Sequence, residues 1–122
     1  MDFEAKIAEL GLLIPKPAKP AGSYKPCVIV DNIAYISGQG PLLEDGSFAK
    51  GKVGADVDLE TAQNHARLCG LAILSALKNE IGSINKVDQL IKLTGFVNCI
   101  ESFTQQPLVI NGCSNMMKDI FG

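Results

Sequence analysis

The sequence predicts an α+β domain built on a mixed sheet, with two helices packed on one face. Its 122 residues are enough for one compact core and too few for two. Along the chain, apolar residues alternate or recur at helical spacing in the order hairpin, strand, helix, strand, helix. That order gathers the helices on one side of the sheet, which is the α+β arrangement.

Residues 1–19 are expected to form a short helix and a proline-rich strap, ahead of a domain that spans residues 20–122. In the segment DFEAKIAELG, apolar residues follow one another at spacings of four and three, and Gly11 fits a left-handed cap. The prolines of IPKPAKPAG disfavour helix in the residues before them, so this stretch is predicted to be extended.

A hairpin is predicted next. Two runs rich in β-formers, Cys27 to Val30 and Ile33 to Ser37, flank Asp31 and Asn32, which are residue types that tolerate tight turns. A short strand near residues 48–53 is expected to follow, although its glycines weaken the pattern.

The clearest pattern is helical and runs from Leu59 to Ile81. Asp58 is placed to cap its N-terminus, and Gly82 ends it. Small side chains along it would let the helix lie close to a sheet: Ala62, Ala66, Gly70 and Ala72.

A strand and a helix close the sequence. The segment KVDQLIKLTGFVNCI alternates and predicts a half-polar strand with Ile91, Leu93, Gly95 and Val97 on one face. A second helix is expected to begin near Pro107, with apolar residues at spacings of four, three and four. This helix needs another strand to bury its stripe, so we expect either a fragment or a partner that supplies the missing sheet.

Composition excludes several classes of function. The net charge is −2, with one arginine among the eleven basic residues, so we do not expect nucleic acid to be the main partner. No segment is apolar enough to cross a membrane, and MDFEAKIAEL lacks the features of a secretory signal, so we expect a cytoplasmic protein. The cysteines lack zinc-pair spacing, so free thiols and no metal are expected: Cys27, Cys69, Cys99 and Cys113.

Four segments carry a resemblance to a known family: PAGSYKPCVIVDNIAYISGQGP, AQNHARLCGLAILSALKNEIGSINKV, QLIKLTGFVN and VINGCSNMMKDIFG. In this order they are similar to the RidA/YjgF family, also called the endoribonuclease L-PSP family, in a less-studied branch with an N-terminal extension. The resemblance implies a chorismate-mutase-like fold and a homotrimer with ligand clefts between subunits. It also implies hydrolysis of reactive enamines or imines without a cofactor or metal.

The resemblance also implies a set of cleft residues. By position, Tyr24, Ser37 and Asn111 match residues that line the family's cleft, and Gly38 and Gln39 complete the motif at the strand end. From the residues alone, each has a plainer interpretation. Ser37 would bond its own turn, Tyr24 would be a core or interface ring, and Asn111 would be a solvated helix position. Glycines at 38 and 40 would permit an anion nest or serve a simple turn.

Two groups of the family's site do not carry over. The carboxylate-binding arginine and a functional glutamate lie on strands after the second helix, and the sequence reaches Gly122 before them. We therefore expect the domain to lack its C-terminal strands. Arg67 lies inside the first long helix, and no motif assigns it the arginine's role.

Three functions remain in order of preference. The first is hydrolysis of 2-aminoacrylate-type enamines or imines to a 2-keto acid and ammonia, in an intersubunit cleft. The second is a non-catalytic trimer that binds or senses a small carboxylate metabolite. The third is a ribonuclease, for which a single histidine and a negative net charge are poorly suited.

Overall fold

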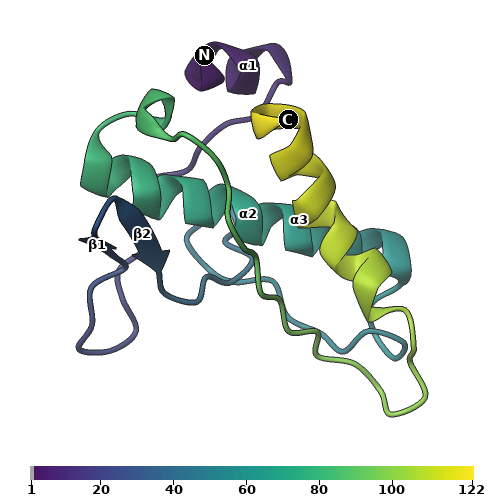
Figure 1. Cartoon of the computed structure of the whole chain (residues 1–122). Coiled ribbons are helices and arrows are strands. Elements are labelled where there is room, and N and C mark those ends of the chain that lie inside the picture. Colours follow the sequence, from purple (N-terminus) through teal and green to yellow (C-terminus); the bar gives the residue numbers. More distant parts are fainter. Residues whose placement is uncertain (1) are drawn as a thin grey trace.

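The computed structural model describes residues 2–122, and three helices dominate it. Helix α2 runs across the whole molecule, α3 crosses it, and α1 lies beside the C-terminal end of α3 (Figure 1). The elements, in chain order, are α1 (Phe3–Glu9), β1 (Cys27–Val30), β2 (Ile33–Ile36), α2 (Leu59–Ile81), the 3₁₀ helix η1 (Ile84–Lys86) and α3 (Gln106–Phe121). Within the described residues, no helix is long and apolar enough to cross a membrane.

The predicted hairpin is confirmed. Strands β1 and β2 pair antiparallel, with Cys27 opposite Ile36 and Val30 opposite Ile33. Asp31 and Asn32 have φ of 49° and 64°, and two consecutive positive φ values give the turn that matches the twist of paired strands. The hairpin is the only sheet within residues 2–122, so the mixed sheet we expected is replaced by two antiparallel strands.

The strands expected at 48–53 and 91–98 do not form. Val53 makes isolated bridges with Val57 and Cys99, and the segment before Cys99 passes across α2 without a ladder (Figure 1). The predicted alternation of buried and exposed side chains in this segment is present in part. Leu93 and Val97 pack on the core, whereas Phe96 is 94% exposed. A ladder needs a neighbouring strand, and none lies alongside this segment in the described part of the chain.

Helices α2 and α3 pack so closely that their contact requires glycine. A side chain at Gly112 of α3 would collide with the backbone carbonyl of Gln63 in α2. At Gly70, an added Cβ would lie 2.9 Å from the Cys113 sulfur. The α2–α3 contact therefore forms the centre of the core, together with buried Met117 and the residues around it.

Both predicted ends of α2 are confirmed. The Asp58 side chain accepts a hydrogen bond from the Thr61 N–H at 2.8 Å, and Gly82 follows the helix with a φ of 89°. Helix α3 begins at Gln106, with Pro107 in its first turn as expected.

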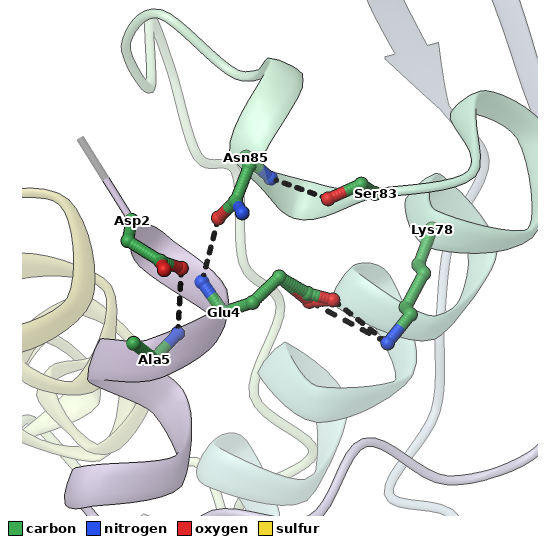
Figure 2. A network of polar contacts seen from close by, with 6 residues as sticks. All are labelled: Asp2, Glu4, Ala5, Lys78, Ser83 and Asn85. Atoms are coloured by element: carbon green, nitrogen blue, oxygen red, sulfur yellow. Dashed lines mark hydrogen bonds and ion pairs between the residues drawn. The ribbon is translucent and has the colours of Figure 1, made fainter.

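Helix α1 is fastened to the end of α2 by polar contacts (Figure 2). Asp2 caps the helix through the Ala5 N–H at 2.9 Å, and the Glu4 N–H donates to Asn85 Oδ1 at 2.8 Å. The Glu4 carboxylate pairs with Lys78 of α2 at 2.7 Å. On the apolar side, Phe3 packs edge-on against Phe121 with ring centroids 4.9 Å apart. The N-terminal helix is thus packed into the same core.

Candidate functional site

The end of β2 holds Ser37 in a fixed position. The Ser37 N–H donates to the Pro26 carbonyl at 2.9 Å, and the Ser37 hydroxyl donates to the same oxygen at 3.3 Å. The side-chain amide of Gln39 donates to the Ser37 carbonyl at 3.3 Å. The plainer interpretation of Ser37 is therefore present, but its hydroxyl oxygen keeps lone pairs that can accept from a ligand.

Strand alternation decides which face Ser37 occupies. Cys27 and Ile36 pack toward α2, so their neighbours along each strand point to the opposite face. Ser37 follows Tyr35 by two residues and belongs to that opposite face. We call it the outer hairpin face, and its other members are apolar and exposed: Val28, Val30, Ile33 and Tyr35.

Gln39 faces inward and lines a cavity of about 20 Å³ beneath the proline strap. The cavity also touches Pro17, Pro26 and Ser75, and the Ser75 hydroxyl donates to the Pro15 carbonyl at 2.6 Å, which holds the strap on α2. A space of this size accommodates about one water molecule. The Gln39 amide is thus positioned as a support for Ser37 within its own chain.

The glycines of the strand end have different surroundings. An added Cβ at Gly38 would meet nothing within 4 Å, whereas one at Gly40 would lie 2.9 Å from Cδ1 of Phe48. Neither glycine has a positive φ, and an anion nest requires alternation with left-handed residues. Gly40 makes room for the Phe48 ring, and Gly38 leaves the backbone open to approach.

Tyr24 and Asn111 lie on different elements. Tyr24 is 48% exposed, and its hydroxyl accepts from the Ala21 N–H at 3.4 Å. Asn111 is half-buried on α3 and makes no side-chain hydrogen bond to any residue in the described range 2–122. Helix α3 contacts α1 and α2 but not the hairpin, so one chain does not bring Asn111 to Ser37.

Sequence analysis did not single out Lys25, which lies between Tyr24 and the Pro26 carbonyl. Its ammonium pairs with Glu80 of α2 at 3.3 Å, in a solvent-exposed contact that contributes little to stability. Alternation along the strand places Lys25 with Cys27, on the face opposite Ser37. The signal in the sequence is a lysine that directly follows Tyr24. Arg67, by contrast, lies on α2 away from the hairpin, among residues of α3 and the turn after α1.

Three of the four thiols are poorly suited to nucleophilic chemistry. Burial raises the pKa of Cys113 to about 11, with a smaller contribution from nearby Cys69. Burial also raises the pKa values of Cys27 and Cys69, so these thiols stay protonated near neutral pH. Residues 2–122 contain no group of three histidine, cysteine or acidic side chains arranged to hold a metal ion.

One family model covers almost the whole chain. A family model described as "YjgF/chorismate mutase-like, putative endoribonuclease" matches residues 4–122. Protein TCP17 of Trypanosoma cruzi is 34% identical over 118 residues, which are 97% of this chain and 74% of that protein.

Two crystal structures resemble the chain closely. A "putative endoribonuclease" from Shewanella oneidensis superposes with a TM-score of 0.95 at 30% identity, over 100% of this chain and 81% of that one. The protein Atu1372 of Agrobacterium tumefaciens, described as of unknown function, gives a TM-score of 0.86 at 40% identity, over 98% of this chain and 73% of the other. The expected α+β, chorismate-mutase-like fold is therefore confirmed.

Proposed function

We propose a function from one premise: this chain belongs to the YjgF/chorismate mutase-like family. In our proposal it binds a small enamine or imine that carries a carboxylate, and it promotes hydrolysis at the end of β2. Water adds to the imine carbon, the carbon–nitrogen bond breaks, and the products are a 2-keto acid and ammonia. This hydrolysis requires no redox change and no cofactor.

The outer hairpin face is the single observation that carries the proposal. It exposes apolar side chains from both strands, including Tyr35 at 58%, and Ser37 lies at its end. Contiguous exposed apolar surface marks a site of interaction with another surface. A second copy of the chain laid over this face would enclose Ser37 in a cleft with restricted access to water. We therefore propose a homotrimer with three such clefts.

Ser37 contributes a positioned oxygen to that cleft. Three hydrogen bonds fix its backbone and hydroxyl, so little reorganisation is needed when a substrate arrives. The free lone pairs of the hydroxyl would accept from the attacking water or from the iminium N–H. A single donor or acceptor held in this way contributes a rate factor of about 100 in comparable sites.

Tyr24 and Asn111 complete the proposed cleft from different chains. Tyr24 belongs to the loop that leads into β1. It comes two residues before Pro26, whose carbonyl accepts the hydrogen bond from the Ser37 hydroxyl. Asn111 is distant from the hairpin of its own chain, so in this proposal a neighbouring copy supplies it. Its side-chain amide is not engaged within residues 2–122 and has both donors and an acceptor to offer.

The endoribonuclease activity named for the Shewanella protein is the competing candidate. RNA binding draws on rows of unpaired cations, and this chain has a net charge of −2 with Lys25 and Lys78 paired to carboxylates. Charge therefore favours the small anionic substrate over a polyanion.

The test follows 2-aminoacrylate produced in situ from L-serine by a pyridoxal-phosphate-dependent dehydratase. We expect the chain to accelerate pyruvate and ammonia release, and Ser37→Ala to lower that acceleration about 100-fold. Ser102→Ala, at an exposed position in the turn before α3, is the matched control and should retain full activity. Absence of acceleration, or salt-sensitive cleavage of RNA in its place, would remove the proposal.

A further inference from the structure

A groove of about 240 Å³ lies where α2, α3 and the turn after α1 meet. Its polar wall is formed by Arg67 of α2 and by Asn115 and Asp119 of α3, and its apolar wall by Leu10, Leu12 and Met116. None of these residues belongs to the hairpin or lines the cavity at Gln39. Within one chain the groove is therefore separate from the hairpin part of the proposed cleft, and Asn111, which a neighbouring copy would supply to that cleft, directly precedes the groove-lining Gly112 on α3.

The helix crossing explains why the groove opens there. At Gly112, α3 lies so close to α2 that an added Cβ would collide with the Gln63 carbonyl. Arg67 is one turn beyond Gln63 on α2, and Asn115 is about one turn beyond Gly112 on α3. The crossed helices move apart beyond the contact, and the turn after α1 borders the space that results (Figure 1).

The charged and polar side chains of the groove form no hydrogen bond or ion pair with the rest of the described chain. Within residues 2–122, the side chains of Arg67, Asn115 and Asp119 make no hydrogen bond or ion pair. Arg67 and Asp119 line the same groove, yet they are farther apart than the 4.0 Å limit of an ion pair. A solvent-exposed cation and a solvent-exposed anion thus border one small space without direct contact between them.

We propose that this groove binds a free α-amino acid with an aliphatic side chain. The Arg67 guanidinium suits bidentate contact with the α-carboxylate, and the Asp119 carboxylate suits the α-ammonium. A simple anion would be attracted by Arg67 and repelled by Asp119, and a simple cation the reverse, so a zwitterion is selected. This assignment does not depend on the reaction proposed for the hairpin cleft.

Size and apolarity narrow the ligand class. The volume of about 240 Å³ is below the roughly 300–1,000 Å³ of pockets for drug-sized ligands, which fits a molecule of amino-acid size. Leu12 and Met116 are buried beneath the groove, and Leu10 is partly exposed at its edge. These side chains would contact an aliphatic group and would leave a charged one unsatisfied.

Calorimetric titration of the full chain with L-leucine tests the assignment. We expect saturable binding with a Kd of about 1 mM or lower. L-Leucinamide lacks the carboxylate and 4-methyl-2-oxopentanoate lacks the ammonium, so each should bind at least about 10-fold more weakly. No saturable heat with L-leucine, or equal affinity for either analogue, would overturn the proposal.

Substitutions locate the binding within the molecule. Arg67→Gln and Asp119→Asn should each weaken L-leucine binding about 10-fold or more, because each removes a charged hydrogen-bonding partner. Lys118→Gln and Asp88→Asn remove exposed charges outside the groove and should change nothing, as should Ser37→Ala. Unchanged affinity in Arg67→Gln, or loss of binding in Ser37→Ala, would contradict the groove as the site.

Discussion

Gly112 shows how one residue sets the spacing of two helices. Its Cα faces the backbone of Gln63, and no flexible side chain lies between them to move aside. We expect Gly112→Ala to lower the free energy of unfolding by about 2 kcal/mol or more, through overpacking of the α2–α3 contact. Urea denaturation checks this. Gly38→Ala is the matched control, because an added methyl there meets open space, and its effect should stay within about 0.5 kcal/mol.

Cys113 couples the core to pH at the same contact. Its pKa rises from 9.0 to about 11 on folding because burial disfavours the thiolate. The folded state therefore holds its proton more tightly, and this stabilisation is fully present below pH 9 and is lost as pH rises toward 11. The loss amounts to about 2–3 kcal/mol. Urea denaturation at pH 8 and pH 11 should show a smaller decline in Cys113→Ala than in the wild type, and an equal decline would contradict the assignment.

At the scale of elements, α1 depends on a side chain far away in the sequence. Asn85 accepts the Glu4 N–H at the first turn of α1, where backbone donors lack helical partners (Figure 2). We expect Asn85→Ala to cost about 1 kcal/mol and to speed hydrogen exchange of the α1 amides. Asn64→Ala, at an exposed position of α2, should leave both quantities near wild type. Unaltered exchange in Asn85→Ala would show that α1 is held by its apolar contacts alone.

Elements defined by local signals were predictable from the sequence, and those defined by a partner were not. Short-range hydrogen bonds and backbone dihedrals define these elements. Asp58 and Gly82 cap the two ends of α2, and the positive φ values of Asp31 and Asn32 form the hairpin turn. The alternating segment at 91–98 has the periodicity of a strand, but pairing depends on what lies beside it. In the same way, the resemblance to a known family pointed to Ser37. The groove at Arg67 is formed by residues from three separate elements, so no sequence motif predicts it.

At the scale of the whole molecule, the outer hairpin face is where we expect copies of the chain to meet. Sedimentation equilibrium should give three times the chain mass of 13.0 kDa. Tyr35→Lys places a charge on that face and should shift the population toward monomer. Leu13→Lys changes an even more exposed apolar residue outside the face and should leave the assembly intact. A monomer at the concentrations used for activity would contradict the assembly.

Subunit mixing tests the shared cleft most directly. If Ser37 of one copy acts with Asn111 of its neighbour, Ser37→Ala and Asn111→Ala chains are each inactive alone but can rebuild intact clefts together. After unfolding and refolding in equal amounts, about a quarter of the clefts in a cyclic trimer should hold both native residues. We predict recovery of about that fraction of the wild-type rate of pyruvate release. Mixed chains that remain as inactive as each variant alone would contradict the shared cleft.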